Sequence, residues 1–131
     1  MTRLSVVIPA LNEESGIADI AGRVLAVAPA LRLVDVAGLE LIVVDDGSTD
    51  GTWRILERLH ADDPHLKAVR FKRNFGQHPA MHAGLVRARG GIVVTMDADL
   101  QNAPAFHYAS DTRATTAPAT RAPAGTTAPK P

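Results

Sequence analysis

Over the first hundred positions, apolar residues alternate between short continuous runs and stretches with helical spacing. The continuous runs are rich in Val, Ile and Leu, and they have the length of strands buried on both faces. The predicted strands cover residues 4–8, 39–44, 67–71 and 92–96. Proline cannot donate to a strand ladder, so we expect the first strand to end at Pro9.

Stretches with helical spacing separate these runs. The clearest is an amphipathic helix predicted over residues 17–28, which Pro29 is expected to stop. Further helices are predicted over residues 52–60 and 79–88, with Gly84 allowing the second to approach a sheet closely. Strands alternating with helices predict an α/β fold, a parallel sheet with helices on both faces and the common strand order 3-2-1-4.

The composition changes after Pro104. Ala, Pro and Thr dominate residues 105–131, which contain few large apolar residues. Such a segment cannot bury enough apolar surface to offset the entropy cost of ordering it. We therefore predict one domain over residues 1–104 and a disordered tail over 105–131, with a short ordered stub near Phe106.

Charge and composition exclude several kinds of protein. The 14 basic and 14 acidic residues give zero net charge, which favours neither nucleic acid nor an anionic membrane surface as a partner. The absence of cysteine excludes disulfides, thiolate metal sites and a cysteine nucleophile. With no signal-peptide pattern and no run of about 20 apolar residues, we expect a cytoplasmic protein, at most peripheral at the inner face of the membrane. The oligomeric state stays open.

Polar residues cluster directly after each predicted strand. The clusters are Asn12 with Glu13, Asp45 with Asp46, Arg73 with Asn74, and residues 97–101. Ligands of open α/β sheets bind outside the carboxyl ends of the strands, where the strand order reverses. The four clusters therefore predict one binding site at that edge.

The last cluster has the pattern of a metal site. In a strand, alternate residues point to the same side, so Asp97, Asp99 and Gln101 can converge on one point. Their oxygen atoms suit Mg²⁺ or Mn²⁺ held against a diphosphate. In isolation, an Asp-x-Asp pair is more often a solvated turn.

The other clusters extend this site toward a nucleotide. Glu13 and Asp46 are acceptors suited to a nucleobase N–H and to ribose hydroxyls, and Arg73 could contact phosphate. There is no Gly-x-Gly-x-x-Gly motif after the first strand and no Gly-Lys-[Ser/Thr] loop. A nucleotide-diphosphate site is therefore favoured over a dinucleotide cofactor or P-loop site.

Four motifs, in this order, resemble those of family 2 glycosyltransferases with the GT-A fold. They are residues 7–13, residues 43–52, Arg73-Asn74-Phe75-Gly76 with residues 80–85, and residues 96–101. The nearest branch is the dolichol- or polyprenol-phosphate sugar transferases. The resemblance covers residues 4 to about 104.

The resemblance implies a role for each matching position. The nucleoside pocket would be lined by Pro9, Leu11, Glu13, Val44 and Asp46, with Asp46 on the base. Asp97, Ala98 and Asp99 would contact the donor at its ribose and diphosphate, and Asp99 and Gln101 would hold the metal. Leu11 departs from the aromatic residue common in this family.

The implied reaction transfers a sugar from a nucleotide-diphosphate donor to an acceptor, with inversion. The acceptor-binding half of similar proteins is missing, so the chain resembles a truncated copy of weak or no activity. A hydroxyl acceptor needs a general base, and none is present in the domain. A lipid phosphate is already an anionic nucleophile, which favours a polyprenyl or dolichyl phosphate acceptor and leaves the catalytic residues unassigned.

Other interpretations remain open. A phosphatase of the haloacid dehalogenase type also has a strand that ends in Asp-x-Asp, but usually as its first strand. A receiver domain has an acidic pair like Asp45-Asp46, also after its first strand. A third alternative is a fragment that binds a nucleotide sugar without turnover. His78 and His82 lie four apart on a predicted helix but lack a third metal ligand.

Overall fold

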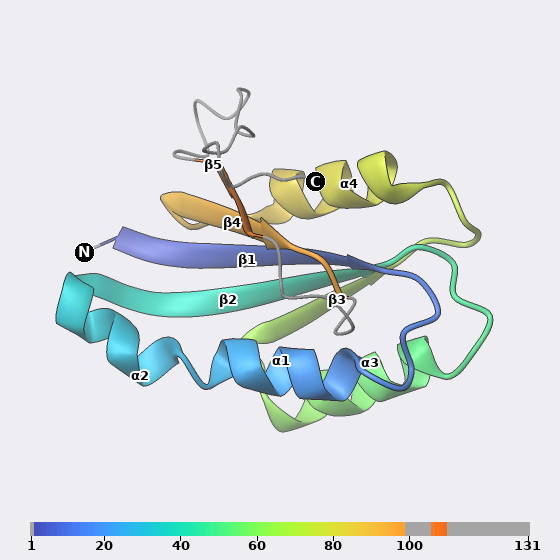
Figure 1. Cartoon of the computed structure of the whole chain (residues 1–131), viewed down its shortest axis with the longest axis horizontal. Coiled ribbons are helices and arrows are strands. Elements are labelled where there is room, and N and C mark those ends of the chain that lie inside the picture. Colours follow the sequence, from blue (N-terminus) through green and yellow to red (C-terminus); the bar gives the residue numbers. More distant parts are fainter. Residues whose placement is uncertain (1, 99–105, 110–131) are drawn as a thin grey trace.

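The computed structural model describes residues 2–98 and 106–109 (Figure 1). Strands and helices alternate along the chain as predicted. The elements are β1 (Thr2–Ala10), α1 (Ile17–Leu25), α2 (Ala28–Leu31), the 3-10 turn η1 (Arg32–Val34), β2 (Val36–Asp45), α3 (Thr52–Asp62), β3 (Leu66–Arg70), α4 (Gln77–Arg87), β4 (Ile92–Met96) and β5 (Phe106–Ala109). Within this part of the chain, no helix is long and apolar enough to cross a membrane.

The strands form one sheet in the order β3-β2-β1-β4-β5. The first four are parallel, which confirms the predicted order 3-2-1-4. The fifth is antiparallel to β4, with Met96 opposite Phe106 and Val93 opposite Ala109. It lies where a short ordered stub was expected, and the predicted disorder of residues 110–131 falls outside the described residues.

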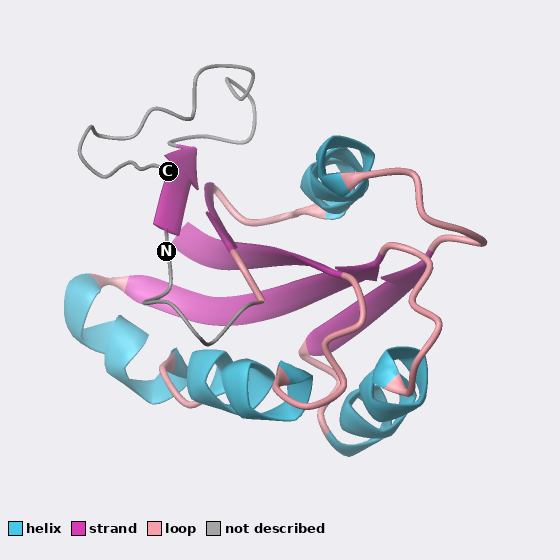
Figure 2. Cartoon of the chain, turned by 45° about the vertical axis from the view of Figure 1, so that its right-hand side comes forward, coloured by secondary structure: helices cyan, strands magenta, loops and turns pink. Residues whose placement is uncertain are grey.

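Helices cover both faces of the sheet (Figures 1 and 2). Because side chains alternate along a strand, Val6 and Ile8 pack with α1 and α3 on one face, and Val7 packs with α4 on the other. Gly84 of α4 lies directly over β1, where a Cβ atom would collide with the Val7 side chain. The prediction that Gly84 allows close packing is therefore confirmed.

The predicted end of β1 at Pro9 is wrong. The strand continues to Ala10, whose carbonyl accepts the Asp46 N–H at 2.8 Å. Backbone groups alternate between the two neighbouring strands, so Pro9 faces β4, and the β1–β4 ladder ends at Val7 opposite Thr95. The missing N–H of Pro9 therefore removes no hydrogen bond to β2.

The predicted helix over residues 17–28 is also shorter than expected. The first helix, α1, ends at Leu25, and Pro29 lies in the first turn of α2 rather than stopping a helix. A proline ring clashes with the carbonyl four residues earlier, which here is that of Leu25. The chain bends before Pro29 and begins a new helix, because the first turn tolerates proline.

Candidate functional site

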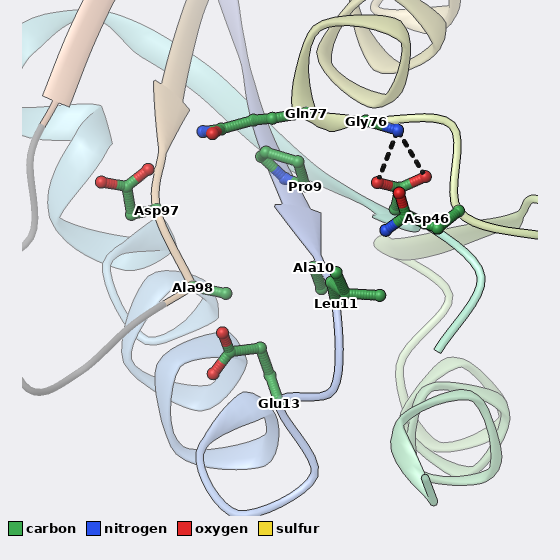
Figure 3. A pocket seen from close by; sticks show the side chains of 10 residues that line it. Pro9, Ala10, Leu11, Glu13, Asp46, Gly76, Gln77, Asp97 and Ala98 are labelled. Carbon is green, nitrogen blue, oxygen red and sulfur yellow. Dashed lines mark hydrogen bonds between the residues drawn. The ribbon is translucent and has the colours of Figure 1, made fainter. Parts of the chain in front are cut away.

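A cleft of about 550 Å³ opens at the carboxyl end of the sheet (Figure 3). It lies where β1 is flanked by β2 and β4, which is the point where the strand order reverses. Its lining residues are Pro9, Ala10, Leu11, Glu13, Asp46, Asn74, Gly76, Gln77, Asp97 and Ala98. Its size is that of a typical small-molecule site.

Asn12 joins the two loops that follow β1 and β2. Its backbone has the left-handed conformation (φ 52°), which Asn tolerates better than most residues. Its Oδ1 accepts the N–H groups of Thr49 at 2.8 Å and Asp50 at 3.3 Å, and its own N–H donates to Ser48 Oγ at 2.8 Å. Asn12 therefore holds the loops together rather than lining the cleft.

Asp50 continues this connection toward the start of α3. Its carboxylate accepts the Thr52 hydroxyl at 2.6 Å, the Thr52 N–H at 2.9 Å and the Glu14 N–H at 3.3 Å. Slight burial raises the pKa of Asp50, but these hydrogen bonds outweigh it and keep the pKa below its ordinary value of 3.8. Thr52 Oγ1 also accepts the Glu13 N–H at 2.9 Å, which fixes the backbone of Glu13 beside the cleft.

Asp46 connects the end of β2 to the loop before α4. Asp46 is only 4% exposed. Its Oδ1 accepts the Phe75 N–H at 2.8 Å. The Gly76 N–H donates to Oδ2 at 3.1 Å and to Oδ1 at 3.3 Å (Figure 3). Gly76 has a φ of 110°, which a residue with a side chain rarely adopts. Asp46 thus sets the direction in which the chain enters α4.

Neighbouring Asp45 points into the protein instead. It is fully buried, and its Oδ1 accepts the Ser48 N–H at 3.0 Å. Its Oδ2 has no hydrogen-bond partner among the described residues. Only one member of the acidic pair therefore faces the cleft.

Three carboxylates and no Lys or Arg side chain line the described part of the cleft. Figure 3 shows Glu13 extending from the loop after β1 toward the end of β4, where Asp97 and Ala98 lie. Gln77 extends from the start of α4 across Pro9 toward the same strand end. A phosphate group entering this cleft would meet negative charge, and a divalent cation would offset it. The hard oxygen donors of Asp97 and Glu13 fit Mg²⁺ or Mn²⁺ in kind.

Six of the predicted site residues come together in this cleft. They are Pro9, Leu11, Glu13, Asp46, Asp97 and Ala98. Val44 does not line it; it is fully buried in the apolar cluster under α4. Arg73 does not line it either, and its guanidinium lies 4.2 Å from the centre of the Phe75 ring.

The rest of the predicted metal site is not described. Asp99 and Gln101 lie outside the described residues. Within residues 2–98 and 106–109, no three His, Asp or Glu side chains are grouped as metal ligands, and this includes His78 and His82.

Sequence reasoning missed Gly76 and Gln77 as lining residues. Both follow the polar pair Arg73-Asn74, and the predicted helix began two residues later, at Pro79. A signal was present, since Gly followed by a polar residue marks a loop that enters a helix. The residue at which α4 begins depends on the long-range hydrogen bonds of Asp46, and no local sequence pattern reveals these bonds.

The fold and cleft define an α/β protein whose candidate ligand site lies at the carboxyl edge of a parallel sheet. Residues 5–108 match the model of glycosyl transferase family 2, and the chain belongs to that family. It is 44% identical over 102 residues to the undecaprenyl-phosphate 4-deoxy-4-formamido-L-arabinose transferase of Pectobacterium carotovorum (strain PC1), covering 77% of this chain and 30% of that protein. The protein of that name from Shewanella sediminis is 40% identical, with the same coverage.

Solved glycosyltransferase structures also resemble this chain. The mannosyltransferase PcManGT from Pyrobaculum calidifontis, in complex with GDP-Man and Mn²⁺, superposes with a TM-score of 0.63 at 32% identity, over 75% of this chain and 28% of that chain. S. aureus TarS in complex with UDP-GlcNAc gives a TM-score of 0.62 at 28% identity, over 74% and 26%. The chain thus spans less than a third of the length of these relatives. Family membership decides against the phosphatase and receiver-domain alternatives.

Proposed function

We propose that this chain forms the donor site of an enzyme that transfers a sugar from a nucleotide-diphosphate donor to a polyprenyl phosphate, with inversion. The observation that carries the proposal is the single cleft that gathers six residues predicted from separate parts of the sequence. Relatives whose names specify undecaprenyl-phosphate transfer, and neighbours solved with UDP-GlcNAc or GDP-Man, support the substrate classes.

Each side of the cleft has its own part in this proposal. Leu11 is 40% exposed and offers an apolar surface to the nucleobase. Glu13 accepts hydrogen bonds from the ribose hydroxyls. Asp46 faces the base and also holds the loop that carries Asn74 and leads to Gln77 at the start of α4. Asp97 lies at the end of β4, where the diphosphate would be.

Asp97, together with Asp99 and Gln101 from the following segment, would hold Mg²⁺ or Mn²⁺. The cation supplies Lewis-acid stabilisation of the charge on the departing diphosphate. A phosphate acceptor attacks as an anion and needs no general base, so the chain need only bind and orient the donor. We place this reaction at the cytoplasmic surface of the membrane, where a lipid phosphate is accessible.

Calorimetry tests the donor site directly. The full chain is titrated with UDP, GDP and their sugars, with and without Mn²⁺. We expect one nucleotide to bind in a Mn²⁺-dependent manner, and we expect Asp97→Ala to weaken that binding at least tenfold. The matched control is Asp19→Ala on the exposed side of α1, which should bind as the wild type does. Equal binding by both variants, or no binding by the wild type, would overturn the proposal.

Nucleotide-sugar binding without turnover is the alternative to transfer. Incubation with a labelled nucleotide sugar and polyprenyl phosphate separates the two. Labelled lipid supports transfer, whereas bound donor without labelled lipid supports the binding function.

A further inference from the structure

The zero net charge of the chain conceals an uneven distribution. Eleven of the 14 acidic residues precede Pro64, and residues 64–96 contain no Asp or Glu. The same stretch contains six basic residues, which are Lys67, Arg70, Lys72, Arg73, Arg87 and Arg89. Residues 64–96 form β3, α4, β4 and their connections, so this part of the fold carries basic residues and no acidic ones.

Four of the six basic residues lie along α4, three near its carboxyl end and one, Arg73, before its start. Lys67, Arg87 and Arg89 line a second cleft, of about 680 Å³, beside α4. Arg73 stacks on Phe75, whose ring lies 5.5 Å from that of Phe71 in the apolar cluster under α4. We call Lys67, Arg73, Arg87 and Arg89 the basic face. Arg70 belongs to the opposite side, 5.3 Å from the Trp53 ring of α3.

The carboxylate of Glu40 also lines this second cleft, but it is buried and fully engaged. It is 8% exposed and accepts the Ser5 hydroxyl at 2.6 Å and the Arg89 N–H at 2.7 Å. Lys67 Nζ donates to its other oxygen at 3.2 Å. The Glu40 charge therefore offsets Lys67, and the three arginine side chains keep the face positive.

Exposed apolar side chains accompany this positive charge. Phe75, just before α4, is 48% exposed, and Val86, near its end, is 63% exposed. A face that combines arginine with exposed aromatic and aliphatic groups suits the headgroup region of a bilayer, where apolar groups insert and cations meet lipid phosphates. Nucleic acid phosphates would also contact the arginines, but an exposed Val86 would add no favourable contact with them.

Acidic side chains on the other face do not cancel this field. Asp19 lies on α1, and Glu57 and Asp62 lie on α3, across the sheet from α4 (Figure 1). A sheet and a helix layer about 10 Å thick separate them from the basic face. That distance reaches the Debye length of about 8 Å at physiological ionic strength, so an approaching surface responds mainly to the nearer charges.

We propose that the basic face docks on an anionic lipid surface, with Phe75 and Val86 as apolar anchors. Phe75 lies between Asn74 and Gly76, which both line the donor cleft, so docking would bring the rim of that cleft to the lipid headgroups. The inference specifies how the proposed lipid-phosphate acceptor would reach the site, and in that sense it rests on the proposed function. The charge separation itself is independent of nucleotide binding.

Vesicle co-sedimentation of the full chain tests the proposal. The probes are phosphatidylcholine vesicles with and without about 30% phosphatidylglycerol, an ordinary anionic fraction. We expect binding only to the anionic vesicles, and release as salt rises toward about 0.5 M. Each cation near such a surface contributes about fivefold, so the triple variant Arg73→Gln, Arg87→Gln, Arg89→Gln should lower the partition coefficient by about 100-fold.

A charge-matched control comes from the opposite face. The variant Arg23→Gln, Arg54→Gln, Arg58→Gln loses the same three charges from exposed positions on α1 and α3, and we expect its binding to stay within about twofold of the wild type. Equal loss in both variants, or no binding of the wild type at low salt, would overturn the proposal. Tighter binding to an RNA oligonucleotide than to vesicles, lost in the basic-face variant, would overturn it in favour of nucleic acid.

The vesicle assay contains no nucleotide. Lipid binding can therefore be absent while nucleotide binding is measured by calorimetry, and nucleotide binding can be absent while lipid binding is present. Thermal unfolding of each variant checks that the fold is kept. If the triple variant fails to fold, two other measurements test the proposal. They are the salt dependence of wild-type binding and the binding of the single variant Arg87→Gln, whose side chain is exposed.

Discussion

The Asp46 carboxylate accepts the N–H groups of Phe75 and Gly76 while it lines the cleft. Asp46 therefore has a structural role in addition to its predicted role in nucleotide binding. The resemblance to family 2 glycosyltransferases implies a contact between Asp46 and the base, whereas the structure gives it backbone partners from the loop before α4. A loss of nucleotide binding after its substitution could therefore reflect a displaced loop as well as a lost contact.

Asp46→Ala should lower the free energy of unfolding by about 1–3 kcal/mol, because it leaves two partly buried N–H groups without their charged acceptor. Urea denaturation measures this change. The matched control is Asp62→Ala on the exposed surface of α3, where we expect a change within about 0.5 kcal/mol. If the two variants were equally stable, the hydrogen bonds to Phe75 and Gly76 would have no structural weight.

At the residue scale, sequence reasoning succeeded for side chains placed directly by strand ends. Glu13, Asp46 and Asp97 follow the ends of parallel strands, and such ends meet at one edge whatever the loops do. It did not place Val44, because a strand buried on both faces has no polar alternation to show which side each residue faces. It missed Gln77 because a long-range bond, from Asp46, decides where α4 begins.

At the scale of elements, close packing of α4 on β1 depends on Gly84. Gly84→Ala should destabilise the protein by about 1–3 kcal/mol, since the added methyl group meets Val7 and Val44 side chains under the helix. Gly22 in α1 is the matched control, because a Cβ there meets nothing within 4 Å. Gly22→Ala should stabilise the protein by about 0.5–1 kcal/mol through helix propensity.

Thermal unfolding of these two variants gives changes of opposite sign if this description is right. A Gly84→Ala variant as stable as Gly22→Ala would show that α4 can move away from the sheet at little cost. The cleft would then lose the rigid position of Gln77 at the start of that helix.

Glu40 connects several elements at the amino end of the sheet. Burial raises the pKa of this carboxyl, but hydrogen bonds from Ser5, from the Arg89 N–H and from Lys67 outweigh burial and hold the pKa below its ordinary value of 4.5. A lowered pKa in the folded state gives stability that is fully present above the unfolded value and is lost as pH falls through the folded value.

Glu40→Gln should therefore be less stable than the wild type at pH 7. The difference should narrow as pH falls below 4.5, because the wild-type carboxyl then becomes protonated as well. Urea denaturation as a function of pH measures it, with Glu57→Gln on the exposed side of α3 as the control. A difference that stayed constant with pH would show that the packing of Glu40, and not its charge, stabilises the fold.

Element types followed from sequence more reliably than element boundaries. The interior of β2 is a continuous apolar run, but the strand begins at Val36 because it pairs with Thr2 of β1, which is a tertiary event. The pairing of β5 with β4 depends on a partner strand that is far from obvious in an Ala/Pro/Thr-rich segment. Local patterns identify an element, and its neighbours decide where it starts and stops.

At the scale of the whole molecule, one edge and one face of the same sheet have different proposed tasks. The carboxyl edge gathers acidic side chains into the donor cleft, and the face covered by α4 carries Arg73 near that cleft and Arg87 and Arg89 toward the amino end of the sheet. A simple sum of charges hid this arrangement, because the acidic residues come early in the chain and the basic stretch comes later. The parallel fold converts that order along the sequence into a separation in space.

The donor cleft draws its lining from β1, β2, β4 and the loop before α4, so the nucleotide should bind only when these parts are folded together. Ligand at 100 times its dissociation constant would then add about 2.7 kcal/mol to the free energy of unfolding. For a domain of about 100 residues, this corresponds to a rise in Tm of at least 10 °C. Differential scanning fluorimetry with UDP or GDP and Mn²⁺ measures the rise.

Addition of EDTA should abolish most of that rise, because without a cation the carboxylates of the cleft repel the diphosphate. Asp97→Ala should do the same in the presence of Mn²⁺, whereas Asp19→Ala should keep the full rise. An undiminished rise in EDTA would show that neutral donors such as Gln77 and Asn74 suffice to hold the diphosphate. The metal would then have to act after binding, on the charge that develops as the donor bond breaks.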